Sequence, residues 1–141
     1  MSDVNDWNTK VIEEFRASGG HVMVDSKDVP ILLLHTRGAK TGEDRVNPVM
    51  YLEDNGLLFV FASKAGADSN PDWYYNLTAH PEVIVELGGD TFAATAIVVK
   101  GEERDRIWNL MAQGMPQFGE YQTKTTRVIP VIELQRFTSP M

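Results

Sequence analysis

The chain has 141 residues, with 43% hydrophobic and 23% charged side chains, and a formal net charge of -7 at pH 7. Because this length supports one hydrophobic core, we expect a single domain over residues 1–141, with an amphipathic helix over 1–20 and a core over 28–137. The acidic balance argues against nucleic-acid binding, which requires cations to neutralise phosphates. Apolar runs are far shorter than the roughly 20 residues that cross a bilayer, and there is neither a cysteine nor a signal-like start. We therefore expect a cytoplasmic protein.

Hydrophobic periodicity predicts mostly short strands and a few helices. An apolar stripe at helical spacing begins the chain, at Trp7, Val11, Ile12 and Phe15. Asn55 and Gly56 separate two apolar runs and tolerate positive φ, which indicates a hairpin, and Pro48 indicates an edge or bulge position in its first strand. In chain order we expect a helix over 5–17, strands over 31–36, 45–53 and 57–63, a short helix over 70–79, strands over 82–88 and 91–99, a helix over 101–113, and a last strand over 128–137.

These elements predict an α+β fold of about six strands, mostly antiparallel, with two or three peripheral helices. Partial closure of the sheet into a barrel would remove most of its free edges. The Gly- and Asp/Ser-rich stretch over 19–28 is expected to be a connection. The Gly- and Pro-interrupted stretch over 115–127 is expected to be irregular.

The stretch HTRGAKTGEDRV gathers cations around two glycines, directly after an apolar run. It is not a P-loop, because the residue before its lysine is alanine. Gly38 and Gly42 would let backbone N–H groups approach an anion, while Lys40 and Arg45 would supply a point charge and a bidentate fork. Lys64 would join them if the strand ends meet. A solvated turn whose cations offset nearby acids fits the residues equally well.

Other familiar chemistry is not indicated. His21, His35 and His80 are widely separated, no H-E-x-x-H pair occurs, and no G-x-S-x-G elbow presents a serine. We expect no metal site, and structural roles for the histidines.

Four blocks of sequence carry a more specific pattern: TRGAKTGEDRVNPVMYLEDNG, FVFASKAGADSNPDWYYNLTAHPEVIVELG, GEERDRIWNLM and FGEYQTKTTRVIPVIEL. In this order, over about 5–137, they resemble the deazaflavin-dependent nitroreductase family, which uses coenzyme F-420. The resemblance implies a mostly antiparallel split β-barrel of the flavin-reductase or PNPOx-like type, with the coenzyme in a groove on the barrel. The phosphate and acidic tail of the coenzyme would lie at the cation-rich turn over residues 38–44, which we call the basic turn. The short helix would help to enclose the deazaflavin.

The resemblance also implies a set of cofactor-binding residues. Those that fall on the family's binding segments are Ala39, Lys40, Thr41, Arg45, Val46, Asn47, Pro48, Val49, Met50, Ala62, Ser63, Lys64, Trp73, Tyr74, Tyr75 and Asn76. A helix that packs on the core through Trp73 and Leu77 is the plainer interpretation of the last segment, and the two interpretations are compatible if they concern different faces.

The implied chemistry is hydride transfer to an electron-poor acceptor, for which the protein mainly supplies positioning. Tyr121 matches a substrate-side tyrosine of the family that would donate a hydrogen bond or proton, although solvent is an alternative donor and core packing an alternative role. The substrate pocket would contain Met115, Phe118 and Tyr121. Because Met50, Met115 and Phe118 stand where relatives carry tyrosines, we expect quinones or conjugated enones to be favoured over nitro compounds.

Two alternatives to this function remain open on the sequence. One is a split barrel that binds FMN or haem, and the other is a non-catalytic carrier of coenzyme F-420. The expected partner is a small-molecule acceptor, membrane contact is expected only through a lipophilic substrate, and the residues leave the oligomeric state open.

Overall fold

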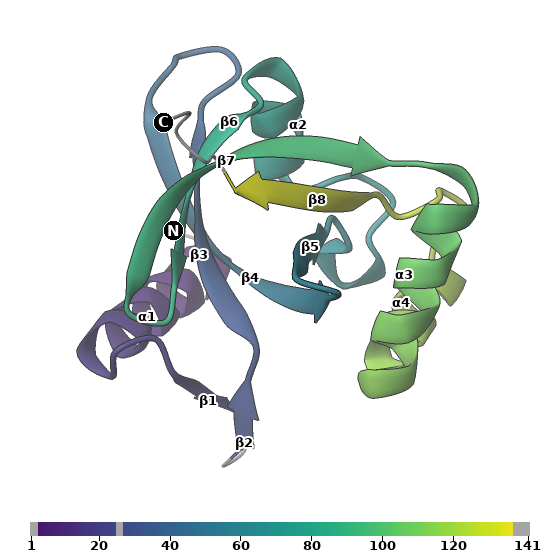
Figure 1. The fold of residues 1–141 in the computed structure, drawn as a ribbon, viewed down its shortest axis with the longest axis horizontal. Helices are drawn as coiled ribbons and strands as arrows, with labels where there is room; N and C mark the ends of the chain where they lie inside the picture. The colour runs from purple at the N-terminus through teal and green to yellow at the C-terminus, as the bar shows by residue number, and fades with distance from the viewer. Residues whose placement is uncertain (1–2, 25–26, 137–141) are drawn as a thin grey trace.

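A closed barrel of six antiparallel strands forms the centre of the computed structural model, which describes residues 3–24 and 27–136 (Figure 1). The elements are α1 (Asp3–Ala17), β1 (Val22–Val24), β2 (Lys27–Val29), β3 (Ile31–Arg37), β4 (Asp44–Asp54), β5 (Leu57–Phe61), the 3-10 helix η1 (Lys64–Gly66), α2 (Asp72–Ala79), β6 (Glu82–Leu87), β7 (Asp90–Val99), α3 (Gly101–Gly114), α4 (Pro116–Thr123) and β8 (Val131–Arg136). The barrel order is β3-β4-β5-β8-β7-β6. This architecture confirms the predicted α+β barrel. The predicted boundaries at residues 1 and 137 lie outside the described residues, and the single domain stays a prediction.

Two elements differ from the expectation. Residues 22–24 and 27–29 form a small antiparallel hairpin, β1 with β2, where a connection was expected, because three-residue strands are too short to show a period. The expectation of an irregular stretch after α3 is wrong, since α4 occupies Pro116–Thr123. Pro116 stands at the start of this helix, where proline is tolerated, and burial of Phe118 outweighs the poor helix propensity of Gly119.

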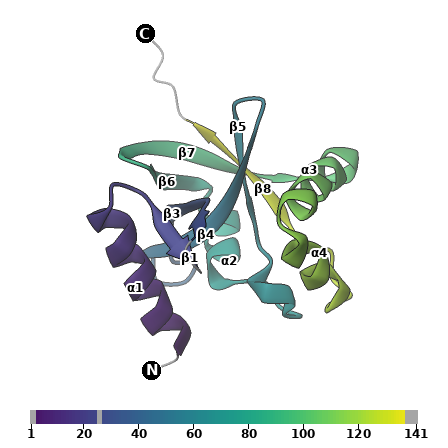
Figure 2. The same ribbon diagram turned by 90° about the horizontal axis from the view of Figure 1, so that it is seen from below.

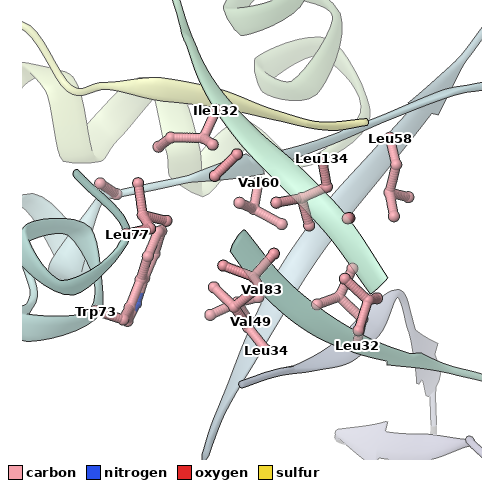
Figure 3. Packing of buried hydrophobic residues seen from close by; sticks show 14 residues of the cluster. Leu32, Leu34, Val49, Leu58, Val60, Trp73, Leu77, Val83, Ile132 and Leu134 are labelled. Carbon is pink, nitrogen blue, oxygen red and sulfur yellow. The ribbon is translucent and has the colours of Figure 1, made fainter. Parts of the chain in front are cut away.

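The barrel interior is filled by alternate residues of its strands, as a two-residue side-chain period requires. Leu34, Val60 and Ile132 are completely buried there. Figure 3 shows Trp73 and Leu77 of α2 directed at this cluster, so α2 covers one end of the barrel. The packing expected of the short helix is therefore present.

The remaining helices cover the outside of the barrel. Figure 2 shows α1 on one flank, α3 and α4 on the other, and α2 between them. Phe15 of α1 packs with Leu33 of β3, and Phe61 of β5 packs with Trp108 and Phe118 of α3 and α4. The side chain of Trp7, which the sequence places on the apolar stripe, lies outside the described part of the chain. No helix within the described ranges is long and apolar enough to cross a membrane.

The barrel is split beside Pro48. Strand β4 pairs with β3 along Asp44–Met50, but it pairs with β5 only from Tyr51 to Asp54. Pro48 thus has a strand neighbour on one side, as a residue without an N–H donor favours, and the predicted edge position is confirmed. The separation of β4 from β5 opens a space between residues 47–50 and the segment that follows β5.

Glu86 links α1 to the barrel through contacts whose contribution to stability should depend on pH. Its carboxylate accepts a hydrogen bond from Arg16 Nη2 at 2.8 Å and contacts His35 Nε2. Arg16 holds the pKa of Glu86 below its ordinary value of 4.5, burial opposes this shift, and His35 adds to it. A lowered pKa in the folded state stabilises the protein above the ordinary pKa, and this contribution is lost as the pH falls through the folded-state pKa.

We expect Glu86→Gln to lower the free energy of unfolding at pH 7. The difference from wild type should begin to shrink as the pH falls below 4.5, where Glu86 of the unfolded chain takes up a proton, and it should be lost as the pH falls through the lower folded-state pKa. Urea unfolding at pH 7 and at pH 3.5 measures it. Glu82→Gln, on the same strand and exposed, is the control that should show neither effect. A difference for Glu86→Gln that does not change with pH would contradict this assignment.

Candidate functional site

Two adjoining cavities lie where the basic turn, the split in the barrel and α2 meet. The larger, of about 790 Å³, is lined by residues of α1, the turn between β3 and β4, the start of β4 and α2: Asn8, Thr9, Ile12, Gly38, Ala39, Lys40, Thr41, Arg45, Val46, Asn47, Asp72, Tyr75 and Asn76. The smaller, of about 540 Å³, lies in the split between β4 and the segment after β5. Its lining residues are Asn8, Asn47, Pro48, Val49, Met50, Phe61, Ser63, Lys64, Pro71, Asp72, Trp73, Phe118 and Tyr121. Together the cavities form one groove, which we call the split groove.

The basic turn is closed by its own backbone. The N–H of Gly38 donates to the carbonyl of Glu43 at 2.7 Å, and the N–H of Gly42 donates to the carbonyl of Gly38 at 2.8 Å. The N–H groups of these two glycines are therefore occupied within the turn, so they are not free to donate to an anion. Gly42, at φ 72°, is instead needed for the turn geometry. The cations themselves remain available, since Lys40 is exposed and the ion pair of Arg45 with Glu43 is also exposed.

Asn76 joins α2 to the basic turn. Its Oδ1 accepts a hydrogen bond from the N–H of Ala39 at 3.0 Å, and its Nδ2 donates to Oγ1 of Thr36 at 3.1 Å. Asn76 and Thr36 are both buried, at 8% and 3% exposure. Buried hydrogen bonds of this kind have few alternative partners, so they fix the backbone of the turn relative to α2. Asn76 thereby holds the turn that carries Lys40.

Aromatic rings and one strained residue shape the smaller cavity. Phe118 packs against Phe61 with ring centroids 5.6 Å apart and against Tyr121 at 5.3 Å. Trp73 is buried and lines the same space, which gives the cavity apolar walls. Lys64 adopts φ 47°, an unfavourable conformation for a residue other than glycine, and its Nζ donates to Oγ of Ser69 at 3.2 Å.

Arg127 holds the segment that contains Lys64. Its guanidinium donates to the carbonyls of Ala62 at 3.2 Å, Ser63 at 3.0 Å and Ala67 at 2.8 Å, and to Oδ1 of Asn70 at 2.7 Å. It forms no ion pair with any residue of the described ranges. The planar guanidinium, with its five N–H donors, thus fixes the conformation of the loop after β5. These hydrogen bonds offset the strain at Lys64.

The same network reaches α4 and Tyr121. Nε2 of Gln122 donates to the carbonyl of Arg127 at 2.7 Å, while its Oε1 accepts from Arg104 and from the N–H of Ile129. The loop after β5 also approaches α4 closely, since a Cβ added to Gly66 would lie 2.8 Å from the carbonyl oxygen of Tyr121. Only glycine permits this approach, so the loop and α4 position each other and set the place of Tyr121.

Comparison with known proteins shows what kind of chain carries this groove. Residues 7–135 match the family model described as F420H(2)-dependent quinone reductase. The chain belongs to this family. The match confirms the resemblance to deazaflavin-dependent enzymes that the sequence blocks predict.

Individual relatives agree with this assignment. The F420H(2)-dependent quinone reductase Rv1261c of Mycobacterium tuberculosis (strain ATCC 25618 / H37Rv) is 38% identical over 110 residues, which are 76% of this chain and 74% of the relative. A solved structure described as an F420-H2 Dependent Reductase (FDR-A) is 42% identical, covers 83% of this chain and all of its own, and superimposes with a TM-score of 0.70. A structure described as a domain-swapped dimer is 39% identical, covers 93% and 98%, and has a TM-score of 0.72.

The structure of this quinone-reductase-family chain brings most of the predicted site residues to the split groove. Three predicted residues lie outside its lining. Ala62 is completely buried in the core, Tyr74 packs on the core beside Tyr75, and Met115 packs with the apolar cluster under α3 and α4. Lys64 lines the smaller cavity and not the larger one that contains Lys40, so the two cations do not share a cavity.

Sequence reasoning missed several lining residues of the groove: Asn8, Thr9, Ile12, Phe61, Pro71 and Asp72. Those on α1 carry no local signal, because an amphipathic helix says nothing about what its polar face meets. Asp72 follows Asn70-Pro71 and precedes the aromatic residues 73–75. A charged residue beside this aromatic run was the signal that could have indicated it.

Proposed function

We propose that this protein is a reductase that transfers hydride from reduced coenzyme F-420 to a quinone-like acceptor. One observation carries the proposal: an aromatic-lined cavity shares three lining residues with a cavity that contains two exposed cations, in a chain of the F420H(2)-dependent quinone reductase family. A ligand with a flat ring at one end and anionic groups at the other fits both cavities at once.

The residues present suit the coenzyme. Lys40 and Arg45 line the larger cavity and would bind the phosphate and acidic tail by charge-assisted hydrogen bonds. Trp73 and Phe118 line the smaller cavity and would enclose the deazaflavin ring, with Ser63 and Lys64 at its edge. The other predicted residues of the turn, of β4 and of α2 that line the groove would complete this binding surface. When bound, the deazaflavin supplies a ring carbon that carries hydride, and it disfavours one-electron steps.

The protein's own contribution is positioning and hydrogen bonding. Tyr121 is half-buried in the smaller cavity, and contact with Phe118 fixes its ring. We assign its hydroxyl to donate a hydrogen bond to the oxygen of the acceptor, where negative charge develops as hydride arrives. Met50 and Phe118 give this cavity apolar, hydroxyl-free surfaces that suit quinones and conjugated enones, with nitro compounds as weaker acceptors. Met115 lies outside the cavity and has no direct part in this selectivity.

Titration of the purified protein with coenzyme F-420 tests the proposal. We expect micromolar binding that Lys40→Ala weakens about tenfold, because a charge-assisted contact to an anion contributes about 1.4 kcal/mol or more. Lys100→Ala, which removes an exposed lysine outside both cavities, should bind like wild type. The oxidation of reduced coenzyme by menadione is then followed by absorbance.

The outcomes separate the competing functions. Absence of micromolar binding would refute the proposal. Tight binding of FMN or haem without binding of coenzyme F-420 would favour the alternative cofactors. Binding without turnover over a broad panel of quinones, enones and nitro compounds would indicate a carrier.

A further inference from the structure

Three polar side chains from three separate elements line the junction between the two cavities of the split groove. Asn8 lies on α1, Asn47 on β4 and Asp72 at the first position of α2, and each of them lines both cavities. No other residue of the described ranges belongs to both linings. A ligand that extends from the aromatic cavity to the basic one must pass these side chains.

Partners within the described residues do not explain the polarity of the junction side chains. Within the described part of the chain, the side chains of Asn8, Asn47 and Asp72 make neither a hydrogen bond nor an ion pair with another residue. By contrast, Asn70 accepts from Arg127, and Asn76 is bonded on both sides. Asn8 and Asn47 are half-buried, so their amides need partners that water or a ligand must supply.

The chemistry of the junction excludes both ends of the expected ligand. An aromatic ring would leave the half-buried amides of Asn8 and Asn47 without hydrogen-bond partners, which costs free energy. A phosphate or carboxylate would be repelled by Asp72, which no described cation neutralises. A chain of hydroxyl groups satisfies all three residues, since hydroxyls donate to a carboxylate and both donate to and accept from an amide.

We propose that Asn8, Asn47 and Asp72 form a polyol-binding junction that recognises the ribityl chain between the deazaflavin ring and the first phosphate. This inference rests on the proposed function and adds a specificity element to it. Along the groove, the lining side chains are first apolar, then the two amides and the carboxylate of the junction, and then basic. This order matches the order of ring, hydroxyl chain and anion in the ligand. The junction thereby selects ligands whose anion is separated from the ring by a hydroxylated linker.

Three ligands separate the subsites in a binding titration. They are the complete coenzyme F-420, a deazaflavin with the ribityl chain but no phosphate or tail, and a deazaflavin with a methyl group in place of the ribityl chain. We expect the wild type to bind the ribityl compound more tightly than the methyl compound. Asp72→Ala and Asn8→Ala should each weaken the coenzyme and the ribityl compound by the same factor, roughly fivefold, and leave the methyl compound unchanged.

Matched variants distinguish this role from a structural one. Asp72→Asn keeps an acceptor at the same place and should retain affinity within about twofold, while Lys40→Ala should weaken only the complete coenzyme. Asp68→Ala, in the preceding loop and outside both cavities, should change nothing.

The opposite results are equally distinct. If Asp72→Ala tightens the coenzyme or weakens all three ligands alike, or if wild type binds the ribityl and methyl compounds equally, the junction is not a polyol site. Micromolar coenzyme binding by wild type alongside such a result would overturn the junction alone. Absence of coenzyme binding would overturn the proposed function and the junction together.

Discussion

Arg127→Met is expected to lower the free energy of unfolding by about 2–4 kcal/mol. The half-buried guanidinium donates to three carbonyls and one amide oxygen in the loop after β5, and methionine would leave these acceptors without their donor. Because the same loop contains Lys64 in its strained conformation, we also expect coenzyme affinity to fall. Urea unfolding and coenzyme titration of the same preparation measure the two effects.

Arg106→Met is the matched control for this experiment. Arg106 contacts two carboxylates, Asp54 and Glu103, but it is 47% exposed, so water screens these ion pairs and its loss should cost much less stability than the loss of Arg127. Both variants remove one positive charge. A larger loss for Arg127→Met would therefore come from its half-buried hydrogen bonds to the loop and not from the loss of charge. Equal losses for the two variants would contradict the role given to Arg127.

Asn76→Leu is expected to reduce both stability and coenzyme binding. Leucine leaves the N–H of Ala39 and the buried hydroxyl of Thr36 without partners, at a cost of about 2–3 kcal/mol in the free energy of unfolding. The basic turn is then no longer held against α2, so we expect the dissociation constant for coenzyme F-420 to rise about tenfold. Denaturant unfolding and fluorescence titration give the two values.

Thr36→Val separates the two effects of Asn76. Valine removes the partner of Nδ2 but leaves the bond between Asn76 and Ala39 intact, so it should lower stability by about 1–2 kcal/mol with little change in coenzyme affinity. Asn109→Leu, on the exposed face of α3, should change neither quantity measurably. An affinity loss in Thr36→Val as large as that in Asn76→Leu would show that general destabilisation, and not positioning of the turn, is responsible.

Local residue chemistry was sufficient for much of the fold. Asn55-Gly56 between two apolar runs predicts the hairpin β4-β5, and Pro48 predicts where β4 is open on one side. These features depend on backbone preferences within a few residues. Helix α4 does not, because its Gly- and Pro-containing sequence becomes helical through burial of Phe118 against Phe61 and Trp108.

The candidate site divides in the same way. The sequence by itself determined the cations Lys40 and Arg45, the aromatic residues of the short helix and the resemblance to coenzyme F-420 enzymes, because residue type and order carry this information. Only the tertiary structure decided that the turn glycines use their N–H groups internally, that Asn76 and Arg127 hold the two loops, and that Lys64 and Lys40 line different cavities of the groove. It also brought Asn8, Asn47 and Asp72 together from α1, β4 and α2. The physical reason is that barrel closure and helix packing create contacts between residues distant in sequence, and no local preference encodes which polar groups will meet there.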